Sequence, residues 1–299
     1  MLDLRRLRLL RELHRRGTVT AVAQALSYSP SAVSQQLATL ERETGVRLLE
    51  PAGRRVRLTA QAVVLVQHAE VLLAEMERAE SALARSLEET AGTLRVAAFQ
   101  TAVLTVVPAA ITRLQLPHPN LRVEVTELEP DVALPALVSG DFDLVLAEEY
   151  PGHPLPHLAG TFREDVFTDE LLLAVPSIWE EQNLYHLAGR PFAMEPAGTP
   201  AGQWARSTCR DAGFEPDVRY TSTDLQIHVR LVEQQLAVAL LPALAGAHSR
   251  RGVTLHHVEG RPKRTVFTTV RSGASDHPSV RAFTAAIAET HEHLEDAHA

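Results

Sequence analysis

The sequence predicts an α + α/β protein in three parts: an N-terminal winged helix-turn-helix, a long linking helix and a larger C-terminal α/β region. Three observations predict this order. Short amphipathic helices joined by a tight turn begin the chain, an apolar repeat of 3.5 residues follows, and strands then alternate with helices. A chain of 299 residues with 45% hydrophobic and 22% charged residues is long enough for several domains with buried cores.

The formal charge of −8 is unevenly distributed along the chain. Residues 1–58 contain eleven arginines and five acidic residues, a net +6, which leaves −14 for the remaining residues. A basic head on an acidic body indicates a head that binds nucleic acid. A chance asymmetry in a short segment is the alternative.

Two helices are expected before residue 30. The first covers residues 3–16 and stops at Gly17, and its apolar side is formed by Leu7, Leu10 and Leu13. The second lies within residues 18–29, with Thr20 as the expected cap. Its inward-facing residues are Val22, Ala23 and Leu26.

The stretch SPSAVSQQLATLE, residues 29–41, predicts a third helix that extends to about Thr44 and stops at Gly45. Ser29 suits the N-cap, and Pro30 takes the first helical position, where its missing N–H costs nothing. The inward face is apolar and consists of Val33, Leu37 and Leu40. The outward face is polar but uncharged and consists of Ser31, Ser34 and Gln35. Such side chains at a helix start suit the edges of DNA bases; an ordinary solvent-facing amphipathic helix is the alternative.

The stretch VRLLEPAGRRVRLT, residues 46–59, predicts a short hairpin after this helix. Gly53 provides the turn, and residues 54–58 alternate as a strand does. Two short helices followed by such a hairpin form the outline of a winged helix-turn-helix. Arg54 and Arg55 are expected at the tip of the wing, near DNA phosphates.

A long helix is expected from Thr59 to about Glu89. Its apolar residues are spaced alternately four and three apart: Leu65, Ala69, Leu72, Met76, Ala79 and Leu83. This spacing is that of a coiled-coil seam and indicates a rod through which two chains dimerise. A helix packed on its own body is the alternative.

The pattern changes after a break at residues 90–93. Strands are expected at 94–99, 121–128, 142–149 and 169–176, with helices between the first three. A second series is expected to comprise a helix at 201–213, a strand at 217–221, a helix at 224–234 and a strand at 236–242. A strand at 265–270 and a helix from Pro278 to about Leu294 close the chain. Such alternation implies largely parallel sheets.

In this order of parts the chain resembles the LysR-type transcriptional regulators (LTTR) of bacteria. The resemblance covers essentially the whole chain and is strongest over residues 4–66. It is carried by Thr18–Ala23, Leu26, Ser29, Ala32–Ser34, Gln36–Leu37, Leu40–Glu41, Gly45–Val46, Leu48–Leu49 and Leu58–Thr59, and downstream by SGDFDLVLAE and LVEQQLAVALLP. The chain departs from the family pattern at Pro30-Ser31, Gln35, Leu49-Glu50-Pro51 and Gln235.

The resemblance implies that the third helix enters the major groove of DNA, with Ser31, Ser34 and Gln35 at base edges and Gln36 at a phosphate. The full set of expected DNA-contacting residues is Thr18, Thr20, Ser29, Ser31, Ala32, Ser34, Gln35, Gln36, Arg54 and Arg55. It implies a winged helix-turn-helix at 1–58, a dimerisation helix at 59–90 and a regulatory domain at 91–299. The expected partners are double-stranded DNA with a pseudo-palindromic promoter site, a small-molecule effector, further copies of the chain as a dimer or tetramer, and RNA polymerase.

The regulatory domain resembles a two-lobed, periplasmic-binding-protein-like fold, with lobe one at 94–163 and 267–299 and lobe two at 164–266. Ligands of such folds bind at the carboxyl ends of strands, between the lobes. The candidate effector residues are therefore Gln100, Thr101, Ala102, Glu148, Gly198, Thr199, Gln203, Ser222 and Thr223. Gln100 and Thr101 would hold a carboxylate and Glu148 an ammonium group, which predicts an amino-acid-like ligand. A solvated loop acid is the alternative for Glu148.

We expect no enzyme, metal or cofactor. The chain has no nucleophile elbow and no phosphate-binding glycine motif, and Lys263 is its only lysine. Cys209 is its only cysteine, so no internal disulfide forms, and its helical setting favours a small buried apolar residue over a redox sensor. The absence of a leader or an apolar run of 18 residues predicts a cytoplasmic protein. A small-molecule carrier whose head binds protein is the alternative function.

Overall fold

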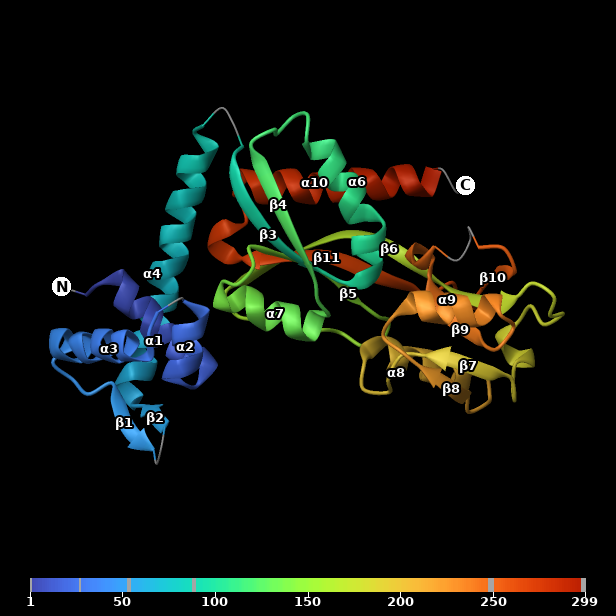
Figure 1. The fold of residues 1–299 in the computed structure, drawn as a ribbon, viewed down its shortest axis with the longest axis horizontal. Helices are drawn as coiled ribbons and strands as arrows, with labels where there is room; N and C mark the ends of the chain where they lie inside the picture. Colours follow the sequence, from blue (N-terminus) through green and yellow to red (C-terminus); the bar gives the residue numbers. More distant parts are fainter. Residues whose placement is uncertain (1, 27, 53–54, 88–89, 247–249, 297–299) are drawn as a thin grey trace.

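The computed structural model describes residues 2–26, 28–52, 55–87, 90–246 and 250–296. A small helical head lies at one end, a long helix runs beside it, and two lobes built on one twisted sheet extend away from the head (Figure 1). The head and long helix comprise α1 (Leu4–Arg16), α2 (Val19–Ala25), α3 (Pro30–Thr44), β1 (Leu49–Ala52), β2 (Arg55–Leu58) and α4 (Ala60–Arg85).

The predicted stops and caps of the head are confirmed, with one exception. Gly17 and Gly45 end α1 and α3 with positive φ angles of 73° and 71°, a conformation that glycine adopts without strain. The expected cap at Thr20 is wrong. Thr18, extended directly after Gly17, accepts a hydrogen bond from the Ala21 amide at 3.2 Å and is the N-cap of α2. Thr20 is exposed inside that helix.

One apolar core holds the head together and includes the start of α4. It contains Leu7, Leu10, Leu13, Val22, Ala23, Val33, Leu37, Leu40, Ala62, Val66 and Ala69. The inward faces predicted for α1, α2 and α3 are confirmed, because these side chains are almost fully buried. Burying a Leu or Val side chain contributes roughly 1.5–3 kcal/mol, so this cluster fixes the angle at which α3 faces outward.

The long helix α4 has 26 residues and ends at Arg85, four residues before the expected Glu89. Its predicted seam is divided between two environments. Ala69 is fully buried in the head core and Leu65 packs partly against it, so Ala69 does not lie on an exposed seam. The remaining members are exposed: Leu72, Met76, Ala79 and Leu83. The reason is that the head's own helices cover the first turns of α4.

The C-terminal region begins with lobe one: β3 (Gly92–Ala98), α5 (Gln100–Leu104), α6 (Val106–Leu114), β4 (Leu121–Glu127), α7 (Pro130–Ser139) and β5 (Leu144–Glu149). β6 (Thr161–Pro176) crosses into lobe two: η1 (Leu184–His186), β7 (Pro191–Met194), α8 (Pro200–Asp211), β8 (Asp217–Thr221), α9 (Leu225–Glu233), β9 (Val238–Pro242), η2 (Ala243–Ala245) and β10 (Val253–His257). β11 (Lys263–Arg271) returns to lobe one, followed by η4 (Ser272–Ala274) and α10 (Pro278–Asp296).

The nine-stranded sheet has the order β4-β3-β5-β11-β6-β9-β7-β8, with β10 paired to β6. The strands that alternate with helices are parallel, as expected: β3 with β4 and β5, and β7 with β8 and β9. The crossing strands β6 and β11 are antiparallel to their neighbours, which the alternation did not predict.

The lobes meet at different residues from those predicted. β6 pairs with β11 through Glu170 and with β9 from Leu171, so the chain enters lobe two at about residue 171 and not at 164. It returns with Lys263 and not at 267. The first half of β6, TFREDVFTDE, mixes charged and apolar residues and does not form an apolar run. The short strands β7 and β10 were also missed by the sequence reasoning.

Candidate DNA interface and effector cleft

The N-terminal half of α3 presents an uncharged polar surface. Ser29 is the N-cap and accepts the Ala32 amide at 3.1 Å, while its hydroxyl also lies 3.0 Å from the Ser31 hydroxyl. Ser34 donates to the Pro30 carbonyl at 3.0 Å. Ser31, Ser34 and Gln35 are exposed and share one face, because residues three and four apart in a helix are neighbours. The structure thus brings together the three predicted base-reading side chains.

Gln36 does not extend outward with them. Its side-chain oxygen accepts a hydrogen bond from Arg6 Nε at 3.0 Å, and Arg6 also pairs with Glu43. Gln36 therefore ties α3 to α1, and the role predicted for it at a phosphate is not supported by its contacts. Ala32, half-buried under the exposed face, contributes no polar group.

The wing is an antiparallel hairpin whose β1 pairs with β2 from Leu49–Leu58 to Ala52–Arg55. Glu41 of α3 fixes the start of this hairpin, because its carboxylate accepts hydrogen bonds from the amides of Leu48 and Leu49 at 2.8 and 3.0 Å. Arg54 and the side chain of Arg55 lie outside the part of the chain that the structure describes. The exposed Arg57 bonds Glu50 through Nε at 2.8 Å.

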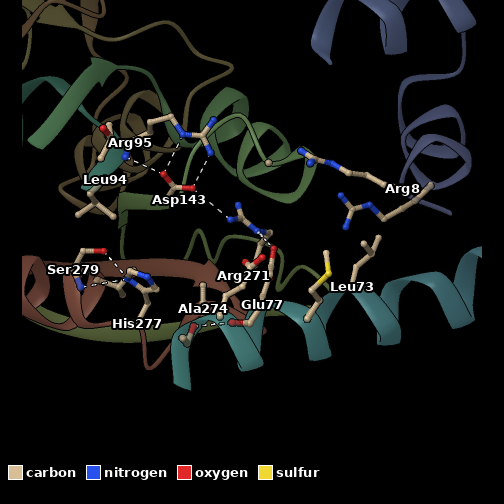
Figure 2. Close-up of a pocket in the computed structure, with 17 residues that line it drawn as sticks. Arg8, Leu73, Glu77, Leu94, Arg95, Asp143, Arg271, Ala274, His277 and Ser279 are labelled. Carbon is tan, nitrogen blue, oxygen red and sulfur yellow. Dashed lines mark hydrogen bonds and ion pairs between the residues drawn. The ribbon is translucent and has the colours of Figure 1, made fainter. Parts of the chain in front are cut away.

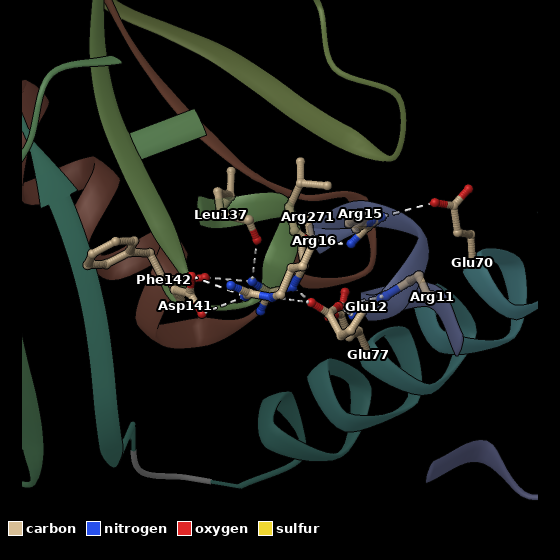
Figure 3. A network of polar contacts seen from close by, with 11 residues as sticks. Arg11, Glu12, Arg15, Arg16, Glu70, Glu77, Leu137, Asp141, Phe142 and Arg271 are labelled. Carbon is tan, nitrogen blue, oxygen red and sulfur yellow. Dashed lines mark hydrogen bonds and ion pairs between the residues drawn. The ribbon is translucent and has the colours of Figure 1, made fainter. Parts of the chain in front are cut away.

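Two further head arginines contact lobe one instead of a surface where DNA could lie. Arg16 binds Asp141 at 3.0 Å, and Arg15 donates to the Val138 carbonyl at the end of α7 (Figure 3). Arg15 also pairs with Glu70 of α4 at 3.1 Å. The basic bias of the head therefore serves in part to dock it on its own regulatory domain, a use that composition alone did not reveal.

A cavity of about 350 Å³ lies where the head, α4 and lobe one meet. Figure 2 shows Arg95 and Asp143 bound to each other at its wall, with Arg271 below and Arg8 pointing in from α1. Arg271 Nε binds Glu77 at 2.6 Å and so joins β11 to α4. Burial alone would raise the pKa of Asp143, but hydrogen bonds and the charge of Arg95 outweigh burial and lower it. Part of the cavity wall is thus formed by ion pairs, Arg95 with Asp143 and Arg271 with Glu77.

The two lobes are bridged by Gln100 at the start of α5. Its amide nitrogen donates to Asp224 at 2.8 Å, and its amide oxygen accepts the Leu225 amide at 3.0 Å. Gln100 is therefore occupied by lobe two. The predicted role of this side chain as a carboxylate anchor is not supported by its contacts.

Beneath Gln100 lies a buried arginine that the sequence reasoning missed. Arg264 has no exposed surface; it binds Asp169 through Nε at 2.9 Å and the Thr101 hydroxyl at 2.8 Å, and it pairs with Glu148. Burial raises the pKa of Glu148 to about 8, against the opposing charge of Arg264. Glu148 is therefore neither a solvated loop acid nor free for an ammonium group, and Thr101 is not free for a carboxylate. The sequence contained one signal for this residue, because Arg264 directly precedes the apolar strand TVFTTV.

The remaining effector candidates from the sequence differ in burial and in their hydrogen-bond partners. Ala102 is fully buried in the core of lobe one and does not face the cleft. Thr199 is the N-cap of α8 and accepts the Gly202 amide at 3.0 Å, while Ser222 accepts the Asp224 amide at 3.0 Å. The exposed candidates are Gly198, Gln203 and Thr223.

A small cavity in lobe two lies directly behind the Leu225 end of the bridge. Its polar or aromatic lining residues are Tyr150, Glu195, Trp204 and His228. Glu195 follows β7, and α8 packs close to this turn because Gly202 has no side chain: a Cβ there would lie 2.1 Å from the Pro196 oxygen. Burial raises the pKa of Glu195 to about 7.

No group of three or more His, Cys, Asp or Glu side chains in the described residues is arranged to hold a metal ion. Among the helices that the structure describes, none is long and apolar enough to cross a membrane.

Two family models match the chain. The model of the bacterial regulatory helix-turn-helix protein, lysR family, matches residues 4–63, and that of the LysR substrate binding domain matches residues 87–292. Similar proteins include the DNA-binding transcriptional dual regulator OxyR of Escherichia coli (strain K12), 27% identical over 261 residues and 84% of each chain. The transcriptional dual regulator GltC of Bacillus subtilis (strain 168) is 25% identical over 246 residues and 81% of each chain.

Solved structures share the fold. A full-length OxyR variant from Pseudomonas aeruginosa superposes with a TM-score of 0.69 at 18% identity, covering 96% of this chain and 95% of that one. Full-length CbnR complexed with its target DNA superposes with a TM-score of 0.54 at 21% identity, covering 97% of this chain and 100% of that one.

Proposed function

The chain belongs to the LysR family of bacterial DNA-binding transcriptional regulators, and on that premise we propose that α3 is the helix with which it reads its promoter site. The observation that carries this proposal is the exposed, uncharged face of Ser31, Ser34 and Gln35, backed by a head core that fixes its direction. Glutamine can bond adenine through two hydrogen bonds, and serine accepts several bases.

Phosphate contacts supply most of the affinity in this proposal. The Ser29 hydroxyl and the N-terminal end of α3 would contact one phosphate, and the wing arginines Arg54 and Arg55 would hold another. Thr18 caps α2 and positions its amides in the same way. Binding through these groups releases counterions, so the affinity falls steeply as salt rises.

Regulators of this family bind DNA and small-molecule effectors and form oligomers. For this chain we assign the effector to the space between the lobes, beside the Gln100 bridge, and self-association to the exposed residues Leu72, Met76 and Leu83 of α4. Two heads related by symmetry would read a pseudo-palindromic site in the bacterial cytoplasm. We assign no catalytic step, because the buried Arg264, Glu148 and Asp169 are engaged with one another.

The test is binding of the purified protein to the DNA that flanks its own gene. Fluorescence anisotropy measures this binding at two salt concentrations, with random DNA present in excess as competitor. A salt-sensitive complex that survives the competitor is expected. Absence of binding even at low salt would contradict the assignment of α3.

The base-reading role is tested by Gln35→Ala. We expect the ratio of promoter to random-DNA affinity to fall by about tenfold, since a bidentate base contact discriminates by about 1–3 kcal/mol. Gln182→Ala removes an equally exposed glutamine in lobe two and serves as the matched control. Equal losses on promoter and random DNA would mean that Gln35 does not read bases.

A further inference from the structure

The small cavity of lobe two is built to receive a hydrogen-bond donor. Its lining includes His228, which is 1% exposed. His228 Nε2 lies 2.9 Å from the Ser222 carbonyl. A carbonyl only accepts, so Nε2 carries the hydrogen, and in the neutral ring Nδ1 is then a bare acceptor. Burial lowers the pKa of His228 and keeps the ring neutral. Nδ1 has no hydrogen-bond partner among the described residues.

A carboxylate without a cation lines the same cavity. Within the described part of the chain, no arginine, lysine or histidine forms an ion pair with Glu195. Arg206 lies nearby but donates to the Glu195 main-chain oxygen at 3.0 Å, and Arg264 is held by Glu148 and Asp169. Glu195 is half-buried, and a carboxylate that is partly removed from water is stabilised by a positive partner.

The charges around Glu195 are mixed: Glu129 disfavours its ionisation, and the buried Arg264 favours it. Glu129, at the start of α7 in lobe one, has a raised pKa because of burial and the nearby Asp131 and Glu127. Its charge adds to burial in raising the pKa of Glu195. A positively charged ligand group beside Glu195 would favour the ionised form of this carboxyl.

Two aromatic rings complete the wall. Tyr150 and Trp204 lie with ring centroids 5.9 Å apart and planes inclined by 38°. Aromatic faces attract cations, and the attraction is stronger where water is excluded. The cavity has room for about one water-sized group, which fits an ammonium group and excludes a guanidinium or a ring.

We infer that the effector of this protein carries a primary ammonium group, which enters lobe two between Glu195, His228 Nδ1 and the rings of Tyr150 and Trp204. The inference rests on the proposed effector cleft and names the chemical class of its ligand. An ammonium group donates three hydrogen bonds and carries the missing charge, whereas a hydroxyl supplies one donor and no charge. The sequence-based expectation of an ammonium group is kept, but its partner is Glu195 and not Glu148.

The test uses the full chain and four probes of similar length: butylamine, 1,4-diaminobutane, butyrate and 1-butanol. Binding is measured by thermal stabilisation and by the fluorescence of Trp204, with a Trp179→Phe background that leaves one tryptophan. We expect saturable binding of the two amines and not of butyrate or butanol.

Two variants locate the site. Glu195→Gln keeps the shape and removes the charge, and His228→Phe keeps a ring of similar size and removes the Nδ1 acceptor together with the Nε2 donor to Ser222. We expect each to weaken amine binding by about tenfold or more, the magnitude of one charge-assisted hydrogen bond. Glu180→Gln, at an exposed carboxylate of lobe two, should bind as the parent does. Unfolding midpoints without ligand establish that all variants fold.

The outcomes separate this inference from the proposed function, because promoter binding is measured on the same samples without any probe. Saturable binding of butyrate or butanol in place of the amines overturns the inference, as does equal amine binding by the parent and Glu195→Gln. No response to either amine also overturns it. Loss of promoter binding in the parent protein would instead contradict the assignment of α3.

Discussion

At the scale of single residues, Arg264 is the group on which the lobe boundary depends. Its guanidinium is fully buried between Glu148 of β5 and Asp169 of β6, and it also holds Thr101 of α5. One side chain of β11 therefore contacts three other elements, β5, β6 and α5. A buried ion pair need not stabilise a fold more than apolar residues would, but removing one partner leaves an uncompensated charge.

Arg264→Met is therefore expected to lower the free energy of unfolding by about 3–5 kcal/mol, measured by urea denaturation. The control is Arg219→Met, which breaks an exposed pair with Asp217 and should cost less than about 1 kcal/mol. Similar losses for the two variants would show that the buried network contributes no more than a surface pair.

The pKa of Glu195 gives a prediction about pH. Because its folded value of about 7 exceeds the ordinary 4.5, the folded state binds the proton more tightly than the unfolded state. The contribution of Glu195 to the free energy of unfolding is fully present below about pH 4.5, and it is lost as the pH rises through about 7. Glu129, Glu148, His228 and Arg264 are the charged or titratable groups around it.

Glu195→Gln should consequently be more stable than the parent at pH 8, by about 1–3 kcal/mol, with the difference vanishing toward pH 4.5. The measurement is the urea midpoint of both proteins across this range. A difference that does not change with pH would mean that the Glu195 carboxyl titrates normally.

Cys209 is fully buried in α8, and burial raises the pKa of its thiol to about 12. Since the thiolate is the reactive species, the folded protein should react with iodoacetamide at pH 8 about a thousandfold more slowly than the unfolded protein. Equal rates in buffer and in denaturant would contradict the buried position. The sequence suggested this inert residue from its helical setting alone.

At the scale of elements, the position of α4 against lobe one depends on Gly273 in η4. A Cβ at this residue would lie 2.4 Å from the Ala74 oxygen and 2.6 Å from the Glu77 Cβ. Ser81 donates to the Gly273 carbonyl at 3.1 Å and fixes the same approach. Backbone is in contact with backbone here, so the helix has no flexible side chain to move aside.

Gly273→Ala should therefore destabilise the protein by about 1–3 kcal/mol, the usual cost of overpacking. Gly198→Ala is the matched control, because nothing lies within 4 Å of its added Cβ. Thermal unfolding of both variants measures the difference. A Gly273→Ala protein as stable as the Gly198→Ala protein would show that α4 shifts without cost.

The helices of the head could be predicted from sequence because their signals are local. The Gly17 and Gly45 stops, the Ser29 cap and the apolar spacing of α3 each act within a few residues. β6 shows the opposite case: its first half is held by pairing with β11, about a hundred residues away, and no local pattern reports such a partner. β7 and β10 were missed for the same reason.

The candidate sites divide in the same way. The exposed face of α3 followed from helical spacing, whereas the contacts of Gln36, Glu148 and Arg264 depend on residues distant in sequence. Glu195 and His228 come together only when β7, α8 and α9 pack. Strand ends pointed to the boundary between the lobes, and the side chains of Gln100, Thr101 and Glu148 proved to be engaged with other residues there.

At the scale of the whole molecule, we proposed the exposed residues of α4 as the surface for another copy of the chain. Leu83 is 69% exposed, as a residue of an unpartnered seam would be. Leu83→Glu should raise the dissociation constant of the oligomer by about tenfold or more, because burying a leucine contributes roughly 1.5–3 kcal/mol.

Sedimentation equilibrium measures this change, and Leu116→Glu at a 91% exposed leucine of lobe one is the control. An unchanged association constant for Leu83→Glu would place the interface elsewhere.

The division of lobe one between two stretches of sequence has a consequence for synthesis on the ribosome. Lobe two is continuous between the crossing strands, whereas β5 of lobe one pairs with β11, as in Leu144 with Val270. A nascent chain therefore exposes one edge of β5 until lobe two has been translated. Long-range pairing of this kind is slow and open to aggregation. Translation that pauses after residue 262 would give lobe two time to fold first, while the earlier lobe waits for its last strand.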